Sequence, residues 1–343
     1  MKIPFEDKCR KKFFELENKV FDSNFWSEGS LTQKFEEEFG NYVGCGARTI
    51  SSGGAALYSI LEYIGVNNKD VIIPTNTFWA DTRAVQLAGG NPIYADCNKE
   101  DLCLSLDDLK RKITENTKAV IVVHIGGHIA FQIEEIAEYC LKKGIYLIED
   151  CAHAHGAKWE GKVAGTFGFA GAYSFYATKT MPLGEGGMIV SKNKELLQWV
   201  ELFRNYGKDV VNGRVSYKIL NGLNLRISEF TAALGLVQLE RLDEILTWKR
   251  ALAKKYDQIF ENRVKFPEGM ISGYYKYIVF DYDLKEETGK VFNEADFGNV
   301  IQNVKADVEN SIWVARTHRC VPIYYGYENA DKSVVELQGI LLK

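Results

Sequence analysis

Residues 144–191 read GIYLIEDCAHAHGAKWEGKVAGTFGFAGAYSFYATKTMPLGEGGMIVS, and this stretch carries the clearest structural signal in the chain. An apolar run typical of a strand leads into Glu149 and Asp150, and a second apolar and aromatic run ends at Lys179. A glycine-rich turn then precedes a third strand at 188–190. Because buried strands of one sheet end at a common edge, the pattern predicts that one acid and one lysine meet there.

The pattern alone leaves two interpretations of this acid and lysine open. Asp150 and Lys179 could form a structural ion pair, although such pairs stabilise a fold only weakly when compared with apolar side chains. Alternatively, Lys179 could be an amine nucleophile, because burial disfavours the charged form of a lysine and favours the reactive one.

Short apolar strands alternate with helical patterns outside this stretch. Strands are predicted at 71–74, 92–96 and 119–123, and helices at 55–64, 83–87 and 105–113. This alternation is typical of an α/β fold in which helices cover both faces of a mostly parallel sheet. His124 and Asp150 both fall at the carboxyl ends of strands, where such sheets bind ligands.

Longer patterns predict the remaining elements. Helices are expected at 1–21, where the pattern is amphipathic, and at 31–42, 194–203, 228–246 and 247–260, with a long polar surface loop at 207–222.

Several motifs occur in the order of a known family. They are WSEGSLTQKFEEEFGNYVG from Trp26, ISSGGAALYSIL, IIPTNTFWADTRAVQLAGGNPIYADCN, EDCAHAHGA, AGTFG, SFYATK, GEGGMIV and GLNLRISEFTAALGLVQLERLDE. This series resembles the DegT/StrS family of sugar aminotransferases, which belong to the fold-type I pyridoxal-phosphate enzymes. The resemblance covers about the first 245 residues, and the segment THRCVPIYYGYENA departs from it.

The resemblance implies a fold and an activity. The fold would be that of a fold-type I aminotransferase, with a large cofactor-binding domain at 1–245 and a smaller α+β domain at 246–343. The activity would be transfer of an amino group from glutamate to a keto sugar, with a nucleotide-linked sugar expected, in surface-polysaccharide or aminosugar biosynthesis. The sugar and the position of its keto group stay open.

The resemblance also assigns residues to the cofactor ring. Lys179 would bind pyridoxal phosphate as a Schiff base and later carry a proton, acting as nucleophile and then as general base and acid. Asp150 would pair with the pyridine nitrogen and so favour the protonated ring. His153 would lie near the ring, unless it is a satisfied core histidine. Phe78 would stack on the ring, unless it and Trp79 both belong to the core.

A second group of residues would enclose the cofactor phosphate. The turn at Gly53 and Gly54 places free backbone N–H groups at a helix N-terminus, although such turns are also common without a ligand. The family more often has Gly-Thr at this point, so this chain would lack the contact of the threonine hydroxyl with the phosphate. Ser174 would add a hydroxyl, unless it only caps a turn, and Asn224 would reach across a homodimer to the neighbour's phosphate.

Composition limits the other possibilities. The formal net charge is −4, and no run rich in Lys or Arg indicates nucleic-acid binding. No apolar run reaches the ~20 residues of a membrane-spanning helix. The seven cysteines show no CxxC spacing, which favours reduced thiols and a cytoplasmic location.

A metal site and two other functions are the alternatives to an aminotransferase. His124 and His128 are four residues apart, but the intervening glycines disfavour a helix, so no metal site is expected. Some relatives dehydrate deoxysugars, but they replace the lysine with histidine, whereas this chain keeps Lys179. A non-catalytic binding protein on the same fold is the remaining alternative.

Overall fold

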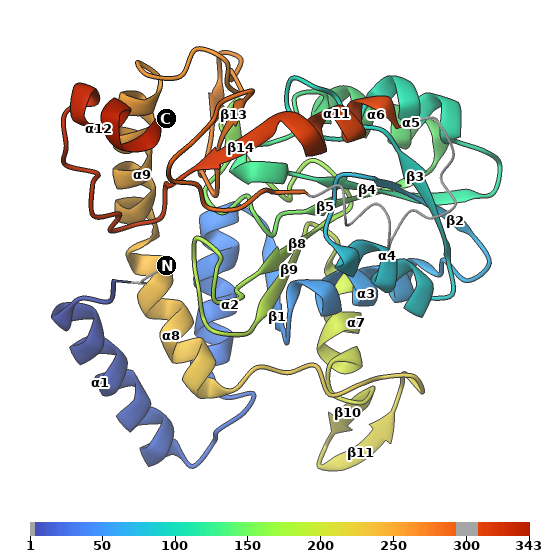
Figure 1. Cartoon of the computed structure of the whole chain (residues 1–343). Helices are drawn as coiled ribbons and strands as arrows, with labels where there is room; N and C mark the ends of the chain where they lie inside the picture. Colours follow the sequence, from blue (N-terminus) through green and yellow to red (C-terminus); the bar gives the residue numbers. More distant parts are fainter. Residues whose placement is uncertain (1–3, 293–307) are drawn as a thin grey trace.

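Seven strands form the central sheet of the protein (Figure 1). The structure is a computed structural model that describes residues 4–292 and 308–343. The strand order is β1-β9-β8-β5-β4-β2-β3, and only β9 runs against its neighbours. The strands are β1 (Gly46–Ile50), β2 (Asp70–Pro74), β3 (Asn91–Ala95), β4 (Thr117–Val123), β5 (Tyr146–Asp150), β8 (Ala170–Ser174) and β9 (Gly187–Ser191).

Helices cover both faces of this sheet, as Figure 1 shows, so the α/β fold with a mostly parallel sheet is confirmed. The central strands are buried on both sides, which explains their nearly continuous apolar sequences. The helices around the sheet are α2 (Ser30–Val43), α3 (Gly53–Ile64), α4 (Trp79–Leu87), α5 (Leu106–Lys112), α6 (Ile133–Lys143) and α7 (Lys194–Phe203), with a short 3-10 turn η1 (Ile125–Gly127) after β4.

The second run of the opening stretch is shorter than the sequence predicted. β8 ends at Ser174, so Lys179 lies in the following turn and not at the end of a strand. The backbone N–H of Lys179 donates to the carbonyl of Tyr176 (2.9 Å), which closes that turn. β5 and β8 are parallel neighbours, with Asp150 opposite Ala172, so the turn after β8 starts at the edge where Asp150 lies.

The long helix predicted at 228–246 is broken. α8 (Glu229–Glu240) ends at Arg241, where ψ is −1°, and α9 (Leu242–Tyr256) continues through the start of the helix predicted at 247–260. The Arg241 guanidinium donates to the carbonyl of Pro4 (2.9 Å), so the break is fixed by the chain's N-terminal segment. α1 (Asp7–Ser23) confirms the predicted N-terminal helix, whose residues 1–3 lie outside the described part.

The polar segment 207–222 is not a plain loop. It contains the antiparallel hairpin of β10 (Lys208–Val211) and β11 (Arg214–Tyr217), which projects from the body of the molecule beyond α7 (Figure 1). Sequence analysis missed the hairpin because its short strands carry exposed side chains with no buried face.

A second cluster of buried side chains lies in the C-terminal part. It joins α9 to the antiparallel pair β13 (Tyr277–Phe280) and β14 (His318–Val321), with α12 (Val334–Leu341) packed beside them. α11 (Glu309–Thr317) docks back on the sheet, because Asp96 at the end of β3 accepts hydrogen bonds from the N–H groups of Asn310 and Ser311. The remaining strands are β6 (Lys158–Trp159), β7 (Lys162–Val163) and β12 (Met270–Ile271), which form a small sheet.

The predicted boundary at residue 245 falls inside α9 and stays a prediction. Residues 293–307 of the predicted C-terminal domain lie outside the described residues. All seven cysteines are unpaired, as predicted.

Candidate active site

Asp150 is the last residue of β5 and is almost fully buried, with 8% of its surface exposed. One carboxylate oxygen accepts a hydrogen bond from the backbone N–H of Ala152 (2.8 Å). Burial raises the pKa of Asp150, while this hydrogen bond and the charge of Lys179 act in the opposite direction. The carboxylate is therefore held in one orientation at the end of the strand.

Lys179 reaches the same site from the turn after β8. Burial lowers the pKa of its amine from 10.5 to about 8, and Asp150 is the strongest of the groups that oppose this shift. Its Nζ lies 5.0 Å from the centre of the Tyr275 ring. The structure therefore brings the predicted acid and lysine into one electrostatic environment, and about a tenth of the amine is uncharged at pH 7.

His153 contacts the same aromatic ring as Lys179, that of Tyr275. Its ring stacks on Tyr275, with 4.0 Å between ring centres and 18° between planes. Burial lowers the pKa of His153 well below its usual value, and the charge of Lys179 acts in the same direction, so the ring is neutral. The buried Nδ1 has no hydrogen-bond partner among the described residues, which is not the pattern of a satisfied core histidine.

The two glycines of the proposed phosphate cradle differ in their surroundings. A Cβ on Gly53 would lie 2.8 Å from the Cβ of Ser174, so only glycine lets the start of α3 approach the end of β8 this closely. A Cβ on Gly54 would meet its nearest neighbour, the Ala80 Cβ, at 3.6 Å, which is an ordinary contact. The structure thus places Gly53 and Ser174 side by side at a helix N-terminus, where backbone N–H groups favour an anion.

Phe78 is exposed over 76% of its surface, although it lies between β2 and α4 at the edge of the sheet. Trp79, the first residue of α4, is half as exposed. The alternative that both aromatic rings belong to the core is therefore wrong for Phe78. An open phenyl ring at this edge can stack on a flat ligand.

Asn224 does not join the other predicted site residues within one chain. It is exposed and pairs only with Asn205, on the segment that leads from the projecting hairpin to α8. Among the described residues, no hydrogen bond links it to Lys179, Ser174 or Gly53. The position is open to a neighbouring molecule.

Sequence analysis missed three residues of the site. Tyr275 lies between His153 and Lys179, and Lys249 on α9 donates to the hydroxyl of Thr180. Asp81 is fully buried one helical turn after Phe78; one of its oxygens accepts the Thr77 hydroxyl and the other has no partner among the described residues. Burial, with the charge of Asp150, raises the pKa of Asp81 well above its usual value.

The signals for these residues in the sequence were weak. Asp81 lies in the first turn of α4, where an acid is common, so its sequence position gave no signal of a site residue. Tyr275 and Lys249 lie far from residues 144–191 in the chain, and nothing in their local sequence indicates that they return to it.

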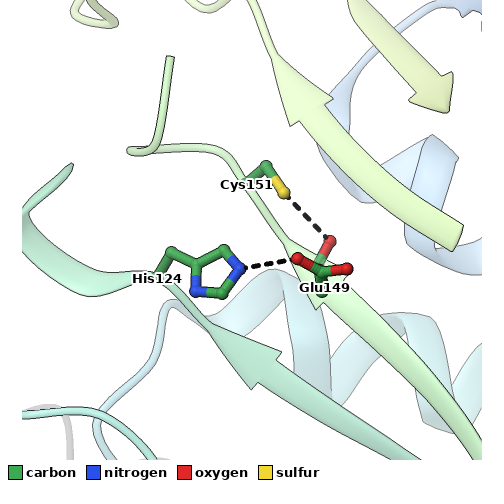
Figure 2. A group of neighbouring side chains, drawn as sticks. All are labelled: His124, Glu149 and Cys151. Carbon is green, nitrogen blue, oxygen red and sulfur yellow. Dashed lines mark hydrogen bonds and ion pairs between the residues drawn. The ribbon is translucent and has the colours of Figure 1, made fainter. Parts of the chain in front are cut away.

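A buried group that could resemble a metal site lies beside Asp150 (Figure 2). It consists of His124, Glu149 and Cys151, and the His124 Nε2 is 2.9 Å from Glu149 Oε2. The Glu149 carboxylate also accepts three backbone N–H groups, those of Gly165, Phe167 and Gly168, each at 2.7 Å. Four donors therefore occupy the oxygens that a metal would need.

His124 and Cys151 also have hydrogen-bond partners within the protein. The Nδ1 of His124 accepts the backbone N–H of Ala130, which leaves the proton on Nε2. The sulfur of Cys151 lies 3.6 Å from the carbonyl oxygen of Glu149, within reach of a thiol donor, and burial raises the pKa of this thiol well above its usual value. We interpret the group as a structural tie that fixes the loop at 163–168 against β4 and β5.

Taken together, the fold and the site are those of an α/β enzyme with a partly neutral lysine beside a buried carboxylate, a helix N-terminus open to an anion, and an exposed aromatic ring. Comparison with known proteins identifies the family within this class. The sequence profile of the DegT/DnrJ/EryC1/StrS aminotransferase family matches residues 7–280. The chain belongs to this family and is an aminotransferase.

Curated relatives and solved structures agree with this membership. The chain is 36% identical over 263 residues to the GDP-perosamine synthase of Escherichia coli O157:H7, which covers 73% of this chain and 69% of that protein. It is 33% identical over 280 residues to the dTDP-4-dehydro-2,3,6-trideoxy-D-glucose 4-aminotransferase of Saccharopolyspora spinosa, covering 76% and 72%.

Two solved structures show the same fold along nearly the whole chain. The aminotransferase TlmJ from Streptoalloteichus hindustanus superposes with a TM-score of 0.86 at 25% identity, covering 96% of this chain and 95% of that one. The sugar aminotransferase CalS13 from Micromonospora echinospora superposes with a TM-score of 0.87 at 22% identity, covering 99% and 98%. Within the described part of the chain, no helix has both the length and the apolar character that a membrane span requires.

Proposed function

We propose that the protein is a pyridoxal-phosphate-dependent aminotransferase that moves an amino group from glutamate to a nucleotide-linked keto sugar. The observation that carries the proposal is that a partly neutral Lys179 and a buried Asp150 influence each other's charge at one edge of the sheet. Gly53 and Ser174 lie side by side at the same edge. The named activities of the relatives support a sugar acceptor.

The residues present fit pyridoxal phosphate. Its phosphate would lie at the N–H groups of Gly53 and Gly54 and the hydroxyl of Ser174, where the space opposite Gly53 cannot hold a side chain. The exposed ring of Phe78 would stack on the heterocycle, and Asp150 would face its nitrogen. The unpartnered Nδ1 of His153 provides a polar contact that the protein itself does not satisfy.

Once bound, pyridoxal phosphate supplies the electron sink for the amino-group transfer. The protein's own contribution centres on Lys179, whose amine must lose its proton to act as a nucleophile and can then hold and release a proton beside the substrate. Its lowered pKa keeps part of the amine uncharged at neutral pH. The neighbouring ring of Tyr275 limits where that amine can move.

The carboxyl groups of Asp150 and Asp81 lie near each other, and they have different roles in this proposal. Within residues 4–292 and 308–343, Asp150 accepts one hydrogen bond, so its other oxygen is available to a protonated ring nitrogen. Asp81 is fully buried, and its described hydrogen bond comes from the Thr77 hydroxyl, whereas Asp150 accepts a backbone N–H and lies near the charge of Lys179. We therefore assign the proton to Asp81 when only one of the two acids is ionised. This division leaves the charge on Asp150.

A homodimer completes the site in this proposal. Asn224 is exposed on a segment that follows the projecting hairpin, where it forms a bridge to Asn205. A symmetric partner would bring its own Asn224 to the phosphate of this chain's site. The seven unpaired cysteines fit a reducing compartment such as the cytoplasm.

The two alternatives are less well supported. Dehydration of a deoxysugar would need another group at position 179, whereas the chain keeps a lysine with a lowered pKa. A purely binding protein would have no need for a neutral amine beside a carboxylate.

Reconstitution tests the proposal. Purified protein mixed with pyridoxal phosphate is expected to gain a visible absorbance band that borohydride erases, and the protein should then convert nucleotide-linked keto sugars to amino sugars with glutamate. Lys179→Ala should lose both properties. A Lys179→Ala protein that still transfers amino groups would refute the assignment, and a product that is dehydrated instead of aminated would favour the dehydratase.

A further inference from the structure

Among the described residues, Lys249 is the most deeply buried lysine, with 4% of its surface exposed. It projects from the middle of α9 into the body of the molecule, beneath the turn that carries Lys179. No carboxylate among the described residues forms an ion pair with it. A buried lysine without an acid partner is rare and costly when it is charged, so its retention needs an explanation.

Its hydrogen bonds connect two segments of the active site. The Nζ of Lys249 donates to the hydroxyl of Thr180 (3.3 Å), the residue after Lys179, and to the carbonyl of Tyr274 (3.2 Å), the residue before Tyr275. A neutral amine has two hydrogens, and these two acceptors use both. Burial, with the charge of Lys276 nearby, lowers the pKa of Lys249 to about 7, which is consistent with a neutral amine.

The two segments meet at the reacting lysine. Tyr275 presents its ring to the Nζ of Lys179 on one side and stacks on His153. Each segment is otherwise anchored to its own neighbours, the Tyr275 segment through the backbone bonds of Gly273 and Lys276 to η1. Among the described residues, the hydrogen-bonded links between the two segments are therefore the bridge through Lys249 and the 3.4 Å contact of Thr178 with the Tyr275 hydroxyl.

We propose that Lys249 is a positioning residue, whose buried amine fixes the Lys179–Thr180 turn against the Tyr274–Tyr275 segment. It holds the nucleophile at its ring contact and keeps water away from it. The description of Lys179 as the nucleophile rests on the proposed function, but the packing argument itself depends only on the contacts of the unliganded protein.

The expected consequence is a change in the ionisation of Lys179. The groups that act on its charge are Asp150 and Asp81, which favour the charged form, and Lys276, which disfavours it. None of them is altered when Lys249 becomes methionine, which keeps the length and volume of the side chain. Water that enters the loosened turn stabilises the charged amine, so the pKa of Lys179 should rise.

Site-resolved acetylation of the unliganded protein over a range of pH measures this directly, because only the uncharged amine reacts. In the native protein we expect the labelling of Lys179 to have its midpoint near pH 8. Lys249→Met should move this midpoint upward by about one unit. Lys254→Met, at an exposed position of the same helix, should leave it unchanged.

Thr180→Val provides an independent arm, because it removes the other end of the hydrogen bond and keeps Lys249. It should shift the midpoint in the same direction, and the double variant should shift it no further than the larger single change. Thr180→Val also carries the test if Lys249→Met does not fold. A folded Lys249→Met or Thr180→Val protein with the native midpoint, or additive shifts in the double variant, would overturn the proposal.

The outcome is separable from the cofactor assignment. If the native protein formed no borohydride-stable adduct with pyridoxal phosphate at Lys179, the proposed function would fail, while the acetylation midpoints would still decide the role of Lys249.

Discussion

At the scale of single residues, the site depends on how burial divides charge among neighbouring groups. Lys179 and His153 both lose part of their affinity for protons, and Asp150 and Asp81 both gain it, because each charged form is separated from water. The net effect is an amine that is available as a nucleophile and a neutral imidazole next to it. A solvated lysine at the same position would be almost entirely charged at neutral pH.

This ionisation predicts a pH dependence. Pyridoxal phosphate should attach to Lys179 faster as pH rises, because the amine loses its proton. The rate should reach half of its maximum near pH 8 and not near 10.5. Stopped-flow absorbance at a series of pH values measures it. A midpoint at the value of an exposed lysine would show that the amine is solvated.

The close contact of Gly53 with Ser174 gives a second prediction. Gly53→Ala introduces a Cβ at 2.8 Å from the Ser174 Cβ, so the start of α3 and the end of β8 must separate. The affinity for pyridoxal phosphate should fall about tenfold or more, equivalent to ~1.4 kcal/mol. Gly54→Ala, whose Cβ has ordinary room, should lower it much less. Equilibrium titration of the apoprotein compares the two, and equal losses would contradict the cradle.

At the scale of elements, the carboxylate of Glu149 links the ends of β4 and β5 to the start of β8. Its four donors come from His124 after β4 and from the loop before β8, so one side chain fixes three parts of the chain beside Asp150. An amide at this position can no longer accept all of these N–H groups, because its nitrogen is itself a donor.

Glu149→Gln should therefore lower the free energy of unfolding by about 3 to 5 kcal/mol, in the range found when one partner of a buried, hydrogen-bonded charge is removed. Chemical denaturation monitored by circular dichroism measures the loss. Glu138→Gln, which alters an exposed pair with Lys142, is the matched control and should leave the unfolding midpoint unchanged. A similar small effect for Glu149→Gln would show that the tie at Glu149 contributes little.

The elements also show how far the sequence determines the structure. Helix 194–203 and the strands around Asp150 were predictable, because periodic apolar residues and an approach to the sheet edge are local signals. The break at Arg241 was not, because it depends on a contact with Pro4, more than two hundred residues away. Hairpin β10–β11 was missed because exposed short strands leave no periodic pattern.

The site divides in the same way. Asp150, Lys179, Gly53, Ser174 and Phe78 could be identified from motifs that surround them in the chain. Tyr275 and Lys249 reach the site only through the docking of the C-terminal part, which is a property of tertiary packing.

At the scale of the whole molecule, we propose that a second chain completes the phosphate site with its exposed Asn224. Hairpin β10–β11 projects from the body, and several of its apolar side chains are exposed, among them Val210, Val211 and Val215. A partner molecule that covers them would bring the following segment to the neighbouring site.

This arrangement predicts complementation between two defective variants. Asn224→Ala lacks the contact that it would give to its partner, and Lys179→Ala lacks the nucleophile, but a mixed dimer contains one site with both residues intact. With random pairing of equal amounts, about a quarter of the sites should be restored. Adduct formation at limiting pyridoxal phosphate measures this, and a mixture that forms no more adduct than Asn224→Ala alone would contradict the shared site.

The central claim is that the amine of Lys179 is the point of attachment for pyridoxal phosphate. Incubation of the purified protein with one equivalent of pyridoxal phosphate per chain, borohydride reduction and peptide mapping by mass spectrometry tests it most directly. We predict one adduct per chain, on the peptide that contains Lys179, with none on Lys249 or Lys276 and none in Lys179→Ala. Absence of an adduct, or its placement on another lysine in the native protein, would contradict the account.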